Sequence, residues 1–183
     1  MSSVCFHILI FRAGKVISLS DCYSSFAAMS GAPSRRLPGK VVQLNASTGG
    51  SGPLPVITTL LAAPISVTSV TIDTIGMRDP AVLLNFSSII SLPIGVSVTL
   101  NFELKRSYNG GAPVSVGSTY TFSTLVEILE SETFGFQFFD SDLIPGVYSY
   151  SVQLSTNSII DITPGVTVNN ATLSALAVDN NPV

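Results

Sequence analysis

Short runs in which every second residue is apolar limit the fold of this chain more than any other feature. The clearest run covers residues 96–105, where Val98, Leu100, Phe102 and Leu104 alternate with polar residues. Residues 148–154, 134–138, 82–86 and 120–128 show the same period, less strictly in the last two. Side chains of a β-strand point alternately to its two faces, so these runs predict strands with one buried face.

Other segments have strand-like composition without strict alternation, and they cover residues 40–45, 54–61, 65–74 and 165–178. Residues typical of turns separate the strands, at 48–52, 78–80, 92–93, 109–111 and 144–146. Many short strands at this spacing are typical of β-sandwiches and jelly rolls. The sequence therefore predicts an all-β jelly-roll β-sandwich of about eight to nine strands over residues 41–183.

Residues 1–40 differ in chemistry from the rest of the chain. They hold both cysteines, Cys5 and Cys22, and the single histidine, His7. Five basic residues against one acid give them a charge of about +4, whereas the three basic residues and ten acids that follow give about −7. We therefore expect an N-terminal connector, residues 1–40, called the arm below, and a jelly-roll body, residues 41–183.

The arm is predicted to dock on a neighbouring copy of the chain. Residues 5–11 and 16–19 have strand-like composition. Exposed edges of an open β-sandwich invite another chain to pair, and an extended segment can add to such an edge as a donated strand. The residues expected to carry this contact are Phe6, Ile8, Ile10, Phe11, Arg12, Val16 and Ile17.

Composition argues against several other classes of function. The sequence pI is near 4.9 and Trp is absent, so no nucleic acid is expected. The apolar run at residues 4–11 is too short to span a membrane, and it lacks the features of a secretory signal. One histidine and no CxxC motif predict neither a metal site nor a cofactor, and the chain is not expected to be an enzyme.

Three local patterns have a functional reading and a structural one. Asp140 and Asp142 resemble part of a calcium loop, but a solvated turn is the favoured interpretation. Phe134, Phe136, Phe138 and Phe139 favour the packed inner face of a sandwich over a ligand cleft. Tyr108, beside the Asn-Gly pair at 109–110, is the best candidate for an exposed aromatic binding residue.

Residues 67–74, 82–87, 118–122, 132–136 and 169–177 resemble a family of uncharacterised small β-proteins of spore-forming Firmicutes. The resemblance covers most of residues 41–178, and by architecture these proteins look like endospore-appendage (Ena) fibre subunits. In that family, jelly rolls stack into helical fibres by sheet augmentation, and disulfides fix the connectors in preceding subunits. The resemblance implies such assembly roles for Cys5 and Cys22. Because residues 41–183 hold no cysteine, the two can pair within or between chains or stay reduced.

We therefore expect a structural subunit that binds itself and forms an extracellular helical filament by strand addition and arm exchange. A spore or cell surface is both the expected location and a further expected partner. Low charge supports this prediction, since 10% of the residues are charged against about 25% in typical soluble domains. The alternatives are a carbohydrate- or surface-binding jelly-roll module and a spore-coat or exosporium layer protein.

Overall fold

A computed structural model describes residues 11–12, 15–16, 42–54, 64–94, 97–125, 130–156 and 165–180. The chain divides into two units, Met1–Leu37 and Pro38–Val183. In the first unit, strand β1 (Phe11–Arg12) pairs antiparallel with β2 (Lys15–Val16). Phe11 stands opposite Val16 in this short ladder.

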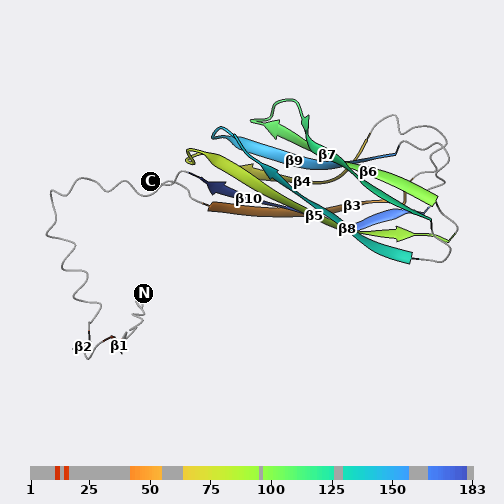
Figure 1. The fold of residues 1–183 in the computed structure, drawn as a ribbon, viewed down its shortest axis with the longest axis horizontal. Coiled ribbons are helices and arrows are strands. Elements are labelled where there is room, and N and C mark those ends of the chain that lie inside the picture. The colour runs from red at the N-terminus through yellow and green to blue at the C-terminus, as the bar shows by residue number, and fades with distance from the viewer. Residues whose placement is uncertain are drawn as a thin grey trace, which may run out of the picture. The chain divides into compact units, whose positions relative to one another are not determined.

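The second unit contains eight strands within its described residues, arranged in two four-stranded antiparallel sheets (Figure 1). The strands are β3 (Val42–Ser51), β4 (Ile65–Asp73), β5 (Pro80–Leu92), β6 (Ser97–Tyr108), β7 (Val114–Leu125), β8 (Glu130–Asp140), β9 (Val147–Ser155) and β10 (Thr167–Asp179). The first sheet has the order β3-β10-β5-β8 and the second the order β4-β9-β6-β7. Eight strands that cross between two facing sheets in this order form a jelly roll, so the predicted fold class is confirmed.

The core lies between the two sheets and is built by the alternation seen in the sequence. On β5 the residues facing inward include Leu84, Phe86 and Ile90, each at most 1% exposed, and the alternate residues Leu83, Asn85, Ser87 and Ile89 are exposed. Phe102 and Tyr150 face them from the second sheet and are fully buried. Burial of each such side chain contributes about 1.5–3 kcal/mol, which makes this layer the main source of stability.

One predicted turn is wrong. Residues 48–51 continue strand β3 instead of ending it. A Cβ atom on Gly49 would lie 2.3 Å from the Val67 carbonyl oxygen, and one on Gly50 would lie 2.7 Å from that of Val168. The glycines therefore allow β3 to run close to the neighbouring backbone, which is the other common use of glycine in strands.

Two further strand predictions differ from the structure in their extent. Strand β7 begins at Val114, ahead of the predicted start at Tyr120. Its first half is largely exposed and rich in Ser and Thr, so no buried face marks it as a strand in the sequence. Most of the strand predicted over residues 54–61 lies outside the described residues, and Leu54 itself is buried outside any strand. Asn109 and Gly110, with φ of 48° and 74°, form the predicted tight turn after β6.

A helix that could span a membrane is not found among the residues that the structure describes.

Candidate functional site

Strand β8 presents a long regular edge with no strand beside it among the described residues. It ends the order of its sheet and pairs with β5 from Leu92–Glu130 to Val82–Asp140 without a register shift. Two hydrogen bonds identify which residues face the free side. The Phe134 carbonyl accepts a hydrogen bond from the side-chain hydroxyl of Ser88 on β5 (3.5 Å), so it points toward β5. The Gln137 carbonyl accepts one from the Tyr120 hydroxyl of β7 (3.4 Å), so it points away from β5. Backbone groups alternate along an antiparallel strand, so odd-numbered residues of β8 face away from β5.

This edge lacks the charges, prolines and bulges that usually prevent strand addition, although one of its outward carbonyls, that of Gln137, already accepts a hydrogen bond from the Tyr120 hydroxyl. Between Thr133 and Phe139 it contains no charged residue, no proline and no register shift. Natural proteins commonly blunt an exposed edge with such features, or cover it with another segment. The charged residues of β8 lie near its ends, where Glu132 is half-buried and Asp140 is buried. The central part of β8 is therefore a candidate acceptor for an added strand.

The other three edge strands are protected. β3 and β4 close one side of the sandwich, because Asn45 Nδ2 donates to the Thr71 carbonyl at 2.7 Å. Edge strand β7 carries a bulge: Phe102 pairs with Tyr120 and Leu104 with Val116, so residues 117–119 stand opposite Glu103 alone. Bulges interrupt the ladder and are a common protection of sheet edges. The edges thus differ, and β8 is the one left regular.

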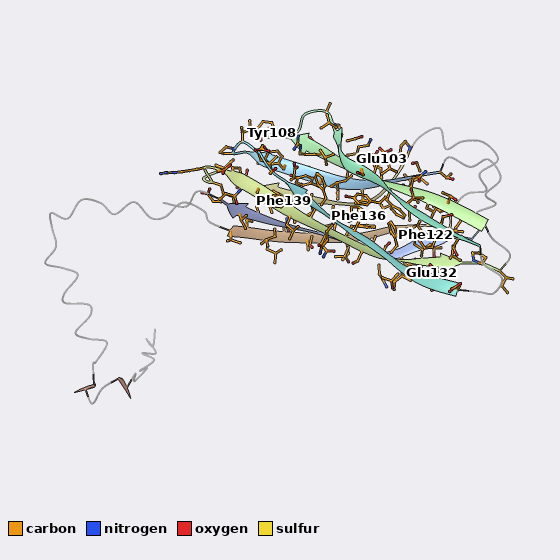
Figure 2. All side chains as sticks on the ribbon, viewed as in Figure 1. Glu103, Tyr108, Phe122, Glu132, Phe136 and Phe139 are labelled. Atoms are coloured by element: carbon orange, nitrogen blue, oxygen red, sulfur yellow. The ribbon has the colours of Figure 1, made fainter. Side chains whose placement is uncertain are left out.

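Aromatic side chains join β7 and β8 where the two sheets meet on this side. Tyr120 stacks on Phe136 with ring centroids 3.9 Å apart and planes 6° apart, and Phe122 meets Phe134 edge-on at 5.9 Å. Figure 2 labels Phe122 of β7 and Phe136 of β8. Phe134, Phe136 and Phe138 therefore pack against the core, as predicted. Phe139 does not, because the alternation of β8 turns it to the outer face, where it is 56% exposed.

A buried polar network links the two sheets at the end of β8. Asp140 is 5% exposed and accepts hydrogen bonds from Arg106 Nη1 of β6 at 2.8 and 3.0 Å and from the Tyr150 hydroxyl of β9 at 2.8 Å. The interpretation of Asp140 as part of a solvated turn is therefore wrong, although Asp142 is exposed. Local sequence contains no sign of this network, because Arg106 lies 34 residues away.

Burial raises the pKa of Tyr150 well above its usual value near 10, and the Asp140 carboxylate raises it further. The unfolded chain loses this proton near pH 10 while the folded chain keeps it. We therefore expect the free energy of unfolding to fall as the pH rises past about 10. Urea unfolding at several values from pH 8 to 11 measures this fall. The Tyr150→Phe variant should show a smaller fall, and an unchanged dependence would contradict the assignment.

Tyr108 is not the exposed aromatic residue that the sequence predicts. Its ring packs on Tyr148 with centroids 5.1 Å apart, and its hydroxyl donates to the Pro145 carbonyl at 3.2 Å. Gly146 permits this contact, since a Cβ there would lie 2.3 Å from the Tyr108 ring. An aromatic platform for a ligand is therefore not formed at Tyr108.

The predicted arm residues fall partly within the structure. Phe11 and Arg12 form β1, and Val16 lies in β2. The remaining predicted residues, Cys5, Cys22, Phe6, Ile8, Ile10 and Ile17, lie outside the described residues. The arm contact and the pairing of the cysteines therefore stay predictions.

No three His, Cys, Asp or Glu side chains of the described residues lie close enough together to share a metal ion. A hollow lies over residues 49–52 of the β3 end and 168–170 of β10, with a volume of about 550 Å³. It is lined by glycine, serine, valine and asparagine. This lining offers hydrogen-bonding groups without a titratable residue.

Fold and topology define the second unit as a jelly-roll domain. The chain belongs to the family described as Domain of unknown function (DUF4489), whose model matches residues 41–178. No curated protein sequence matches the chain.

Solved structures with a similar arrangement have low sequence identity. They include structures of the Gx and Gt strains of infectious bursal disease virus. These match at 10% and 12% identity with TM-scores of 0.48 and 0.47, and the matches cover 78% and 80% of this chain. The chain spans 33% of the length of each of those viral chains. Dimeric latent PorU from Porphyromonas gingivalis matches at 15% identity and a TM-score of 0.40, over 81% of this chain and 14% of that chain.

Proposed function

We propose that this protein is a structural subunit that polymerises with copies of itself into an extracellular helical filament of the spore-appendage type. The observation that carries the proposal is the free edge of β8, which is long, regular and uncharged from Thr133 to Phe139. Backbone groups along such an edge pair readily with a strand from another chain, and an added strand would take the place of the Tyr120 hydroxyl at the Gln137 carbonyl. The proposal assigns the protein no catalytic activity, metal or cofactor, and it places the filament at a spore or cell surface.

The arm is proposed to reach a neighbouring copy. Its charge of about +4 complements the charge of about −7 on the rest of the chain, so arm and body of different copies attract each other. Cys5 and Cys22 would then fix one arm within itself or to another arm, because residues 41–183 contain no cysteine. Strand addition at β8 and arm exchange together extend the assembly in one direction, since a contact between unlike surfaces does not close on itself.

Removing residues 1–38 is expected to abolish filament formation, because the arm is lost while the second unit, Pro38–Val183, keeps its sheets. Negative-stain electron microscopy of the purified full chain and of the truncated chain compares the two directly. The circular dichroism spectrum of the truncated chain should show a β-sheet signal, which establishes that the second unit is still folded.

Filaments formed by the truncated chain would contradict arm exchange. A full chain that stays monomeric at every concentration would contradict the filament itself. A variant with both Cys5→Ser and Cys22→Ser serves as the matched control, because it keeps the arm and removes only the thiols.

A further inference from the structure

The outer face of the β3-β10-β5-β8 sheet carries no charged side chain among its described residues. Its outward positions alternate along the strands, for example Leu83, Asn85 and Ser87 on β5 and Thr133 and Gln137 on β8. The four acids of these strands do not lie on this face: Asp140 and Asp179 are buried, and Glu130 and Glu132 take the alternate positions of β8. Surfaces of small soluble domains usually include about 25–35% charged residues, so a whole uncharged sheet face is unusual.

A row of large apolar side chains crosses this face. The register places Leu44 of β3 opposite Leu176 of β10, Leu176 opposite Leu83 of β5, and Leu83 opposite Phe139 of β8. Leu44, Leu83 and Phe139 are 69%, 39% and 56% exposed, and Leu176 is half-buried. We call these four residues the apolar row. Since strands lie about 4.8 Å apart, the row extends over roughly 14 Å.

The next positions along two of the strands continue the apolar surface. Val42, opposite Val178, is 56% exposed and lies beside Leu44 on the same face. Contiguous exposed apolar surface of this kind marks interaction sites on soluble proteins. Figure 1 shows that β3 begins and β10 ends at the same end of the sandwich, which is where the row lies.

Charge indicates which partner fits this face. A basic segment such as the arm finds no carboxylate there, and an acidic partner finds no base. A second copy of the same face matches it, because a two-fold axis sets the same surface against itself, and like charges on that surface would usually oppose the contact. This face has no charged side chains among its described residues, so no like charges oppose the contact. Two sheet faces can also pack flat, with apolar side chains meeting across about 10 Å.

We propose that the outer face of the β3-β10-β5-β8 sheet packs against the same face of a second copy, centred on the apolar row. The contact is perpendicular to the sheet, whereas strand addition at β8 extends the sheet in its own plane. The two contacts are therefore compatible, and face pairing joins two subunits, or two rows of subunits, side by side. It does not depend on the arm.

Chemical cross-linking of the full chain tests the pairing. The variant carries Cys5→Ser and Cys22→Ser, together with Ser174→Cys on β10, next to the apolar row. A bismaleimide linker with a reach of about 10 Å matches the spacing of two packed sheets. The matched control places the cysteine at Ser151, on β9, the corresponding inner strand of the other sheet. Denaturing gels measure the fraction of cross-linked dimer.

We expect at least about tenfold more dimer for Ser174→Cys than for Ser151→Cys, in line with a preference of one face over the other. Adding Leu44→Lys should reduce the dimer by about tenfold, since the two-fold axis introduces the charge twice. Adding Gln153→Lys, on the other sheet, should leave it unchanged.

Equal cross-linking at the two positions would overturn the proposal without relying on the folding of any lysine variant. A second result would also overturn it. In that result, the linker in a variant with Cys5 restored joins Cys5 to the cysteine introduced at position 174, and no symmetric dimer forms. The arm would then cover this face. Mass spectrometry of the linked peptides distinguishes the two products.

Discussion

Asp140→Ala is expected to lower the free energy of unfolding by about 3 kcal/mol. The carboxylate of Asp140 accepts hydrogen bonds from both Arg106 and Tyr150, and it connects β8 of one sheet to β6 and β9 of the other. Its loss leaves a buried hydroxyl and a guanidinium without that partner. Arg106 keeps 29% of its side chain exposed, so we place the cost at the lower end for a broken buried ion pair.

Urea unfolding near pH 7 measures this effect. Asp142→Asn is the matched control, because Asp142 is an exposed carboxylate two residues away and asparagine tolerates its backbone φ of 58°, so a change within about 0.5 kcal/mol is expected. Asp140→Asn should fall between the two, since it keeps the shape of the side chain and removes its charge. An Asp140→Ala protein as stable as the control would show that the network does not hold the sheets together.

The fold class can be predicted from the sequence because the buried strands follow the two-residue period closely. On β6 and β9 the inward residues, such as Leu100, Phe102 and Val152, are apolar and buried, and their neighbours are polar. Alternation therefore predicts both strands. It does not predict the first half of β7, because both faces of that segment are largely exposed and its composition follows no period.

Other errors arise where one residue type has two uses. Gly49 and Gly50 suggest a turn, yet they serve the close approach of β3 to the backbone at Val67 and Val168. Asp140 suggests a solvated turn from its position after β8, and its hydrogen-bond partners lie elsewhere in the sequence, so the local sequence does not indicate that it is buried. These contacts depend on the packing of one sheet on the other, which local sequence does not describe.

Part of the candidate site can nevertheless be predicted from the sequence. Once Phe138 is placed inward on β8, alternation alone turns Phe139 outward. Every second residue of the four strands, taken together, also shows the uncharged face. The protection of β7 cannot be predicted in this way, because the bulge at residues 117–119 is visible only in the pairing with β6.

Thr133→Pro is expected to abolish filaments while leaving the jelly roll folded. Thr133 is an odd-numbered residue of β8, so its N–H faces the free side and makes no bond to β5. Proline is tolerated at such positions of an edge strand. On that side, however, it removes a donor and places its ring where an added strand would lie.

Thr133→Val is the matched control, because it keeps the N–H and a β-branched side chain, so it should give the same filament yield as the unmodified chain. The central claim, that β8 accepts a strand from a neighbouring copy, is tested most directly by negative-stain electron microscopy of these two full-length variants. Each is first shown to be folded by its circular dichroism spectrum and urea midpoint. Thr133→Val should form filaments and Thr133→Pro none, and normal filaments from folded Thr133→Pro would contradict strand addition at β8.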